Sequence, residues 1–230
     1  MLRKVLFLTV LMLAAQIGLA HAQERTITVI GEGRADVQPD MAMVQLGVVT
    51  EAPGAREAID TNSRAMAAVL DRLKAAGIED RDLQTSNFSV DPRWGRQVDN
   101  TPPKVTGFVA QNMLSVRVRN LDRLGAVLDE VARDGANSFN GLSFGLQDPS
   151  EAQNAARRDA VAKSRALAAL YAEAAGVTLG PLLSLSESGG GGYPMPMARA
   201  EMAMASDAVP VAAGEVSLSA RVTLVYAIAD

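Results

Sequence analysis

The sequence contains no cysteine, and its one histidine is His21, so residues 22–230 carry neither a thiol nor an imidazole. The lack of cysteine excludes disulfides, thiol nucleophiles, thiolate metal sites and iron–sulfur clusters. The lack of histidine excludes Ser-His-Asp and Cys-His catalysis, histidine zinc sites and histidine proton shuttles. An enzyme built from this chain would depend on carboxylates, a tyrosine, a Ser-Lys pair, or one of Lys74, Lys104 and Lys163.

The N-terminus has the pattern of a secretory signal. Arg3 and Lys4 precede an apolar run over residues 5–15, which is too short to span a bilayer, and small residues flank His21 at 20 and 22. We expect residues 1–22 to be a cleaved signal peptide that sends the protein to the periplasm, leaving residues 23–230 without an integral membrane segment. Loss of Arg3 and Lys4 changes the net charge from −4 to −6, which predicts no nucleic-acid partner.

Two glycines, Gly31 and Gly33, stand in the stretch "TVIGEGRADVQPDMA" at residues 28–42, as they do in many phosphate-binding loops. Such a loop needs a helix directly after it, because the helix N-terminus supplies the amides that hold the phosphate. Here alternating apolar residues follow from Val44 to Val48, which is typical of a strand. We therefore predict a strand over 26–30, a turn with both glycines present for backbone freedom, and a strand over 41–50.

Two strand–helix–strand rounds follow, at about 41–92 and 105–149. Helical periodicity runs over 55–76 in the first round and 121–131 in the second, and glycines end both helices at Gly77 and Gly135. "VLDRLKAAG" (69–77) aligns with "VLDEVARDG" (127–135), which indicates an internal repeat. Asn120 is expected to cap the second helix.

The remainder predicts a long third helix from Pro149 to Ala175 with Asp148 as its N-cap, a short strand over 182–186, and a closing strand over 216–228. Residues 187–213 are rich in Gly, Pro, Met and Ala and predict a flexible loop. The fold class is therefore α+β, with a mixed or antiparallel sheet and one domain over 23–230.

These segments resemble the SIMPL-domain family of secreted bacterial proteins, which includes periplasmic immunogenic and oxidative-stress defence proteins. The resemblance rests on "ITVIGEGRADVQPDMAMV", "GFVAQNMLSVRVRNLDRLGAVLDEV", "AARRDAVAKSRALAALYAEAAG" and "GEVSLSARVTLVYAI", and covers roughly residues 26–228. It implies an α+β fold, a location in the periplasm or near the outer membrane, and in some members large ring-like assemblies. It supplies no catalytic residue for this chain.

The methionines of the predicted loop are the one candidate metal site. Met195, Met197, Met202 and Met204 form two M-x-M pairs, and thioethers are soft ligands that suit Cu(I). They could equally be reversible oxidant sinks. A third interpretation, which we favour because four sulfurs without fixed spacing specify no geometry, is a mobile contact segment with no metal.

Other polar residues have structural interpretations beside functional ones. Asn62 and Asn112 lie on apolar faces, where buried amides usually satisfy backbone groups rather than line a ligand cavity. Lys163 and Ser164 are adjacent on a helix and make a poor dyad. Arg117 and Arg119 lie on the less apolar face of their strand and could pair with Glu or Asp across an interface. The carboxylates of Glu32, Asp36 and Asp40 are expected to be solvated or, for Asp40, bonded locally beside Pro39.

We therefore expect a non-catalytic periplasmic envelope protein without a cofactor, which assembles with copies of itself and has a protective role in oxidative or envelope stress. The alternative is a soft-metal or oxidant-handling protein that uses the four methionines. A hydrolase based on carboxylates or lysine would require a pocket in which charged groups converge.

Overall fold

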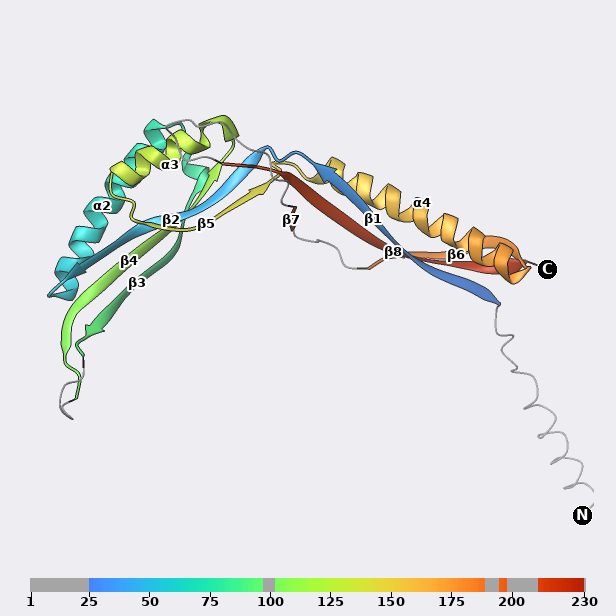
Figure 1. The fold of residues 1–230 in the computed structure, drawn as a ribbon, viewed down its shortest axis with the longest axis horizontal. Coiled ribbons are helices and arrows are strands. Elements are labelled where there is room, and N and C mark those ends of the chain that lie inside the picture. The colour runs from blue at the N-terminus through green and yellow to red at the C-terminus, as the bar shows by residue number, and fades with distance from the viewer. Residues whose placement is uncertain (1–24, 97–101, 189–194, 198–210, 230) are drawn as a thin grey trace, which may run out of the picture. The chain divides into compact units, whose positions relative to one another are not determined.

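The computed structural model describes residues 25–96, 102–188, 195–197 and 211–229 (Figure 1). The chain divides into two compact units. The first consists of residues 1–33, 159–190 and 221–230, and the second of residues 34–158 and 191–220. Among the helices of the described ranges, none combines the length and the apolar character that a membrane span requires.

The second unit contains both predicted strand–helix–strand rounds. The first round is β2 (Met41–Ala52), α2 (Ala55–Ala75), the short 3-10 helix η1 (Asp80–Asp82) and β3 (Leu83–Trp94). The second is β4 (Val105–Val118), the 3-10 helix η2 (Leu121–Arg123), α3 (Leu124–Arg133) and β5 (Ser138–Gly145). The strands form an antiparallel sheet in the order β3-β4-β2-β5, with α2 and α3 on one face (Figure 1).

The two rounds occupy equivalent places in this strand order. Each round contributes two parallel strands separated by one strand of the other round, and two such split β-α-β units make the ferredoxin-like arrangement. The two central strands pair in register from Ala42 with Val118 to Ala52 with Phe108. Their helix-facing residues and the apolar faces of α2 and α3 form the main core, which includes Leu46, Leu73 and Leu114.

The first unit is a sheet covered by one long helix. Strand β8 (Glu215–Ala229) lies between β1 (Thr26–Val37) and β6 (Thr178–Glu187), and α4 (Ser150–Ala175) packs on this sheet. The core here contains Val29, Ala168, Leu224 and Tyr226. In residues of the second unit, strand β7 (Met195–Met197) pairs with β8 at Glu215–Ser217. The predicted α+β class, the long third helix and the long closing strand are confirmed.

The prediction of a turn at Gly31 and Gly33 is wrong. Strand β1 continues through both residues to Val37, and neither glycine has a positive φ. A Cβ on Gly31 would collide with Oγ of Ser164 and with the carbonyl oxygen of Ala160 on α4. The glycine is needed because the helix approaches the strand closely, and not because the backbone turns.

Two segments extend beyond the predicted bounds. Strand β3 runs to Trp94, past the first round that was expected to end at about 92, and β6 begins at Thr178, before the predicted start at 182. Each extension contains Gly, Pro or polar residues on exposed strand positions, where alternation of apolar residues gives no signal.

Candidate functional site

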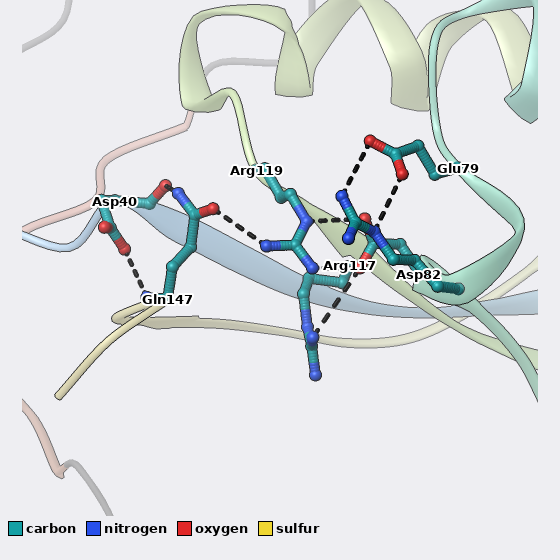
Figure 2. Close-up of polar contacts among 7 residues, drawn as sticks. Asp40, Glu79, Asp82, Arg117, Arg119 and Gln147 are labelled. Carbon is teal, nitrogen blue, oxygen red and sulfur yellow. Dashed lines mark hydrogen bonds and ion pairs between the residues drawn. The ribbon is translucent and has the colours of Figure 1, made fainter.

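A charged cluster forms at one end of the sheet in the second unit, where three elements meet. Helix η1 places Asp82 immediately before β3, and Leu83 pairs with Val116, so Asp82 lies beside the end of β4. That end of β4 carries Arg117 and leads to Arg119. Figure 2 shows contacts from both arginines to Asp82.

Asp82 is held by a bidentate pair. Its side chain is 3% exposed, and Arg119 donates from Nε to Oδ2 at 2.7 Å and from Nη2 to Oδ1 at 2.8 Å. Nη1 of Arg117 lies 3.7 Å from Oδ1. The hydrogen bonds from Arg119, followed by the charges of Arg119, Arg117 and Arg81, hold the pKa of Asp82 below its ordinary value. The carboxylate is thus ionised at neutral pH although it is buried.

The cluster continues as a hydrogen-bonded chain to the start of β2 (Figure 2). Nη1 of Arg119 donates to Oε1 of Gln147 at 3.0 Å, and the backbone N–H of Gln147 donates to Oδ1 of Asp40 at 2.7 Å. Nε2 of Gln147 also donates to the carbonyl oxygen of Asp40 at 3.2 Å. The expected local bond of Asp40 beside Pro39 is therefore replaced by contacts with a residue 107 positions away.

A cleft of about 280 Å³ opens beside this cluster. Its lining includes Arg117, Arg119 and Arg123, together with Glu79 and Asp82. Glu79 is paired with Arg81 at 2.8 Å. Arg119 pairs with Asp82 of the same chain, and Arg117 only approaches it, so pairing of these arginines across an interface stays a prediction. The sequence carried no signal for Asp82, because the contact with Arg119 joins residues 37 positions apart.

Apolar side chains gather on the surface of the first unit at the edge strand β6. Leu182, Leu183 and Leu185 are 47%, 46% and 53% exposed, and β6 ends the strand order β1-β8-β6. A groove of about 580 Å³ lies between α4 and the start of this strand. Its lining is mainly apolar, from Ala162, Ala166 and Ala169 on α4 and Leu179 on β6, with Arg165 and Tyr226.

The predicted methionine site is only partly described. Met195 and Met197 belong to β7, whose backbone pairs with Ser217 and Glu215 of β8. Met202 and Met204 lie outside the described residues. The proposal of a four-thioether site stays a prediction.

The two asparagines that interrupt apolar faces come together as structural residues. Asn62 is fully buried, and its Nδ2 donates to the carbonyl oxygens of Val48 at 2.8 Å and Ala110 at 3.1 Å. Asn112 pairs with Val48 across the central strands. The Oδ1 atoms of Asn62 and Asn112 are both buried without a hydrogen-bond partner among the described atoms.

The three lysines named as possible catalytic groups lie on separate parts of the chain. Lys74 pairs with Asp80 at 2.8 Å and Lys163 with Asp159 at 2.7 Å, whereas Lys104 is exposed. Ser164, next to Lys163, is buried and donates from Oγ to the carbonyl oxygen of Ala160 at 2.9 Å. The structure therefore brings Lys163 and Ser164 no closer to a dyad than their sequence positions predict.

Comparison with known proteins gives a consistent result. The SIMPL family model, described as a protein of unknown function (DUF541), matches residues 27–226. The 26 kDa periplasmic immunogenic protein of Brucella melitensis is 40% identical over 237 residues, covering 96% of this chain and 95% of the relative. The uncharacterised protein YggE of Edwardsiella ictaluri is 30% identical over 77% of this chain and 78% of its own length. YggE of Escherichia coli K12 is 28% identical over 82% and 75%.

Proposed function

The chain belongs to the SIMPL family, and on this basis we propose that it is a periplasmic, non-catalytic envelope protein that assembles with copies of itself and protects against oxidative or envelope stress. The predicted signal over residues 1–22 and the name of the periplasmic Brucella relative support the location. The absence of cysteine and of histidine after residue 21 supports a role that depends on surface contacts rather than on proton transfer.

The observation that carries the assembly proposal is the edge of β6. Natural edge strands are usually short, charged or interrupted by proline, because free backbone groups pair with other strands. Pro181 interrupts the first half of β6, but the following residues "LLSLS" (182–186) present exposed leucines along the edge. Antiparallel pairing with β6 of a second copy would give the free backbone groups of both edges hydrogen-bond partners. It would also bring the leucines of the two copies into contact about a two-fold axis.

Substitution at this edge tests the proposal. We expect multi-angle light scattering of the mature chain to give a mass above that of the monomer, and Leu185→Lys to lower that mass because a charge would be buried at the contact. Val105→Lys is the matched control, since Val105 is also exposed but lies on β4. A concentration-independent monomer, or unchanged assembly of the Leu185 variant, would refute the role of this edge.

The protective role requires a separate test in cells. A strain without the gene should survive peroxide less well than the same strain complemented with the wild-type gene, and complementation with the Leu185→Lys variant should fail if assembly is required. Equal survival of the deletion and complemented strains would remove the oxidative-stress part of the proposal.

A second proposal is soft-metal or oxidant handling by the four methionines. The observation that favours it is β7, because pairing with β8 gives Met195 and Met197 a defined backbone spacing. Titration of the apoprotein with Cu(I) should show saturable binding that is lost when Met195, Met197, Met202 and Met204 are all replaced by leucine. Absence of binding by the wild-type chain would exclude copper handling.

A further inference from the structure

The cleft beside Asp82 contains guanidinium groups whose hydrogen-bonding capacity is only partly used. Three arginines line it, against two carboxylates, Glu79 and Asp82. Glu79 is paired with Arg81, and both oxygens of Asp82 accept from Arg119. The carboxylates are therefore engaged with Arg81 and Arg119, which leaves Arg117 and Arg123 as the cations of the described cleft with free donors.

The hydrogen-bonding capacity of the Arg117 guanidinium is largely unused. Its nearest carboxylate contact is the 3.7 Å approach of Nη1 to Asp82, which is too long for a hydrogen bond. Its Nε is buried and has no hydrogen-bond partner among the described atoms. A buried donor without a partner destabilises a protein, so such a group indicates a missing acceptor.

Arg123, in η2, also lines the cleft. Within the described ranges its guanidinium forms neither an ion pair nor a hydrogen bond. Gly77, at the end of α2, has a φ of +87°, and a Cβ there would lie 3.4 Å from Nη1 of Arg123. The guanidinium group thus rests against a residue without a side chain. The C-terminal end of α2 favours a cation at this position but accepts no hydrogen bond from it.

We propose that this cleft binds a phosphate-type oxyanion between Arg117 and Arg123. The bidentate pair with Asp82 holds Arg119 in one position beside the site. Arg119 therefore does not have to rearrange when the anion binds. Guanidinium groups match the oxygens of phosphate with two parallel N–H donors each. A volume of about 280 Å³ has room for inorganic phosphate or for the phosphate group of a small ester. The site is independent of the β6 edge and of the proposed assembly.

Calorimetric titration of the full mature chain with inorganic phosphate, in a dilute chloride buffer, tests the site. We expect saturable binding with one phosphate per chain, weakened about tenfold or more by Arg117→Ala and by Arg123→Ala. Arg133→Ala is the matched control, because Arg133 is exposed on α3, pairs with Asp129 and does not line the cleft. Thermal melting of each variant checks that it is folded.

Glycerol 3-phosphate used in the same titration distinguishes the source of the anion. Tighter binding of the ester than of phosphate identifies a phosphorylated molecule as the ligand, and equal binding identifies free phosphate; either result supports the site. No saturable binding to either probe, or an equal loss of affinity in the Arg133 variant, would overturn the proposal, since it would leave only general attraction to surface charge.

Discussion

At the scale of single residues, Asp82 makes a pH-dependent contribution to stability. Its pKa is lowered mainly by the hydrogen bonds from Arg119, so the pair stabilises the folded state above the ordinary aspartate pKa of about 3.9. That stabilisation is lost as the pH falls through the lowered pKa of the folded state. The Asp82 carboxylate thus stabilises the fold at neutral pH and no longer does so in acid.

Replacement of Asp82 tests this contribution. We expect Asp82→Asn to lower the free energy of unfolding by about 1–3 kcal/mol at pH 7, because the Arg119 guanidinium loses its charged partner. Urea unfolding at a series of pH values should show the difference from wild type shrinking below about pH 4. Asp71→Asn, at an exposed position of α2, should stay within about 0.5 kcal/mol of wild type throughout. A constant difference at all pH values would contradict the assignment.

Asn62 joins the two central strands to α2 through its side-chain amide. Asn62→Ala removes two donors from the buried carbonyl oxygens of Val48 and Ala110, and we expect a loss of about 1–3 kcal/mol in the free energy of unfolding. Ser63→Ala, at the exposed neighbouring position, is the control in the same denaturant titration. Equal stability of the Asn62 variant and wild type would mean that the carbonyl groups need no second donor.

At the scale of elements, helix α4 lies close to strand β1 because both present small residues. Every fourth residue of the helix is buried and small, and the six are Ala152, Ala156, Ala160, Ser164, Ala168 and Ala172. Opposite Ala160 and Ser164 stands Gly31, which leaves no space for a Cβ. Close approach therefore depends on small volume on both elements.

Gly31→Ala should consequently push the helix away from the strand and destabilise the protein by about 1–3 kcal/mol. The control is Gly141→Ala, because Gly141 is also a strand glycine and a Cβ added to it would meet no atom within 4 Å. Thermal unfolding followed by circular dichroism measures both. A Gly31 variant as stable as the control would show that the contact is looser than the geometry indicates.

At the scale of the whole molecule, the proposed assembly depends on apolar contacts at β6 and is opposed by charge. Residues 23–230 carry a net charge of −6 once Arg3 and Lys4 are removed, so identical subunits repel each other. Salt screens that repulsion and, when sulfate is used, also strengthens apolar association.

We therefore expect the mass measured by sedimentation to rise between about 0.05 M and 0.5 M salt, or the protein concentration at which half of the chains are assembled to fall. The change should be larger in sulfate than in chloride at equal ionic strength. The Leu185→Lys variant serves as the control and should respond much less. Dissociation at high salt would contradict an apolar interface and would indicate that ion pairs join the subunits.

Much of the fold was predictable because local patterns carry it. The 3.6-residue periodicity around Met66 and Val127 identified α2 and α3, alternation from Val216 to Ile228 identified β8, and Asn120 accepts a hydrogen bond from the N–H of Asp122 as a cap should. The glycines of β1 were misinterpreted because a turn glycine and a packing glycine look the same in a sequence.

The candidate site was not predictable to the same degree. For the arginines at the end of β4 the sequence suggested only carboxylate partners. Their partner Asp82 lies in a short 3-10 helix with no periodic signal, and Arg123 resembles any exposed residue at the start of a helix. The pairing of β3 with β4 brings Asp82 to the two arginines, and the segment after Val118 brings Arg123 to the same cleft. Both contacts join residues that are distant in the sequence.

The amino-acid sequence alone therefore excluded cysteine and histidine chemistry from residues 22–230, because composition decides which side chains are present. It also predicted the class of the fold and the order of its main elements, because periodicity is a property of neighbouring residues. The three-dimensional arrangement was needed to show which strand is exposed at an edge, that Asp82 pairs with Arg119, and that Arg117 and Arg123 face one cleft. These features arise from strand register and helix packing, in which the contacts join residues tens of positions apart and no local pattern records the partner.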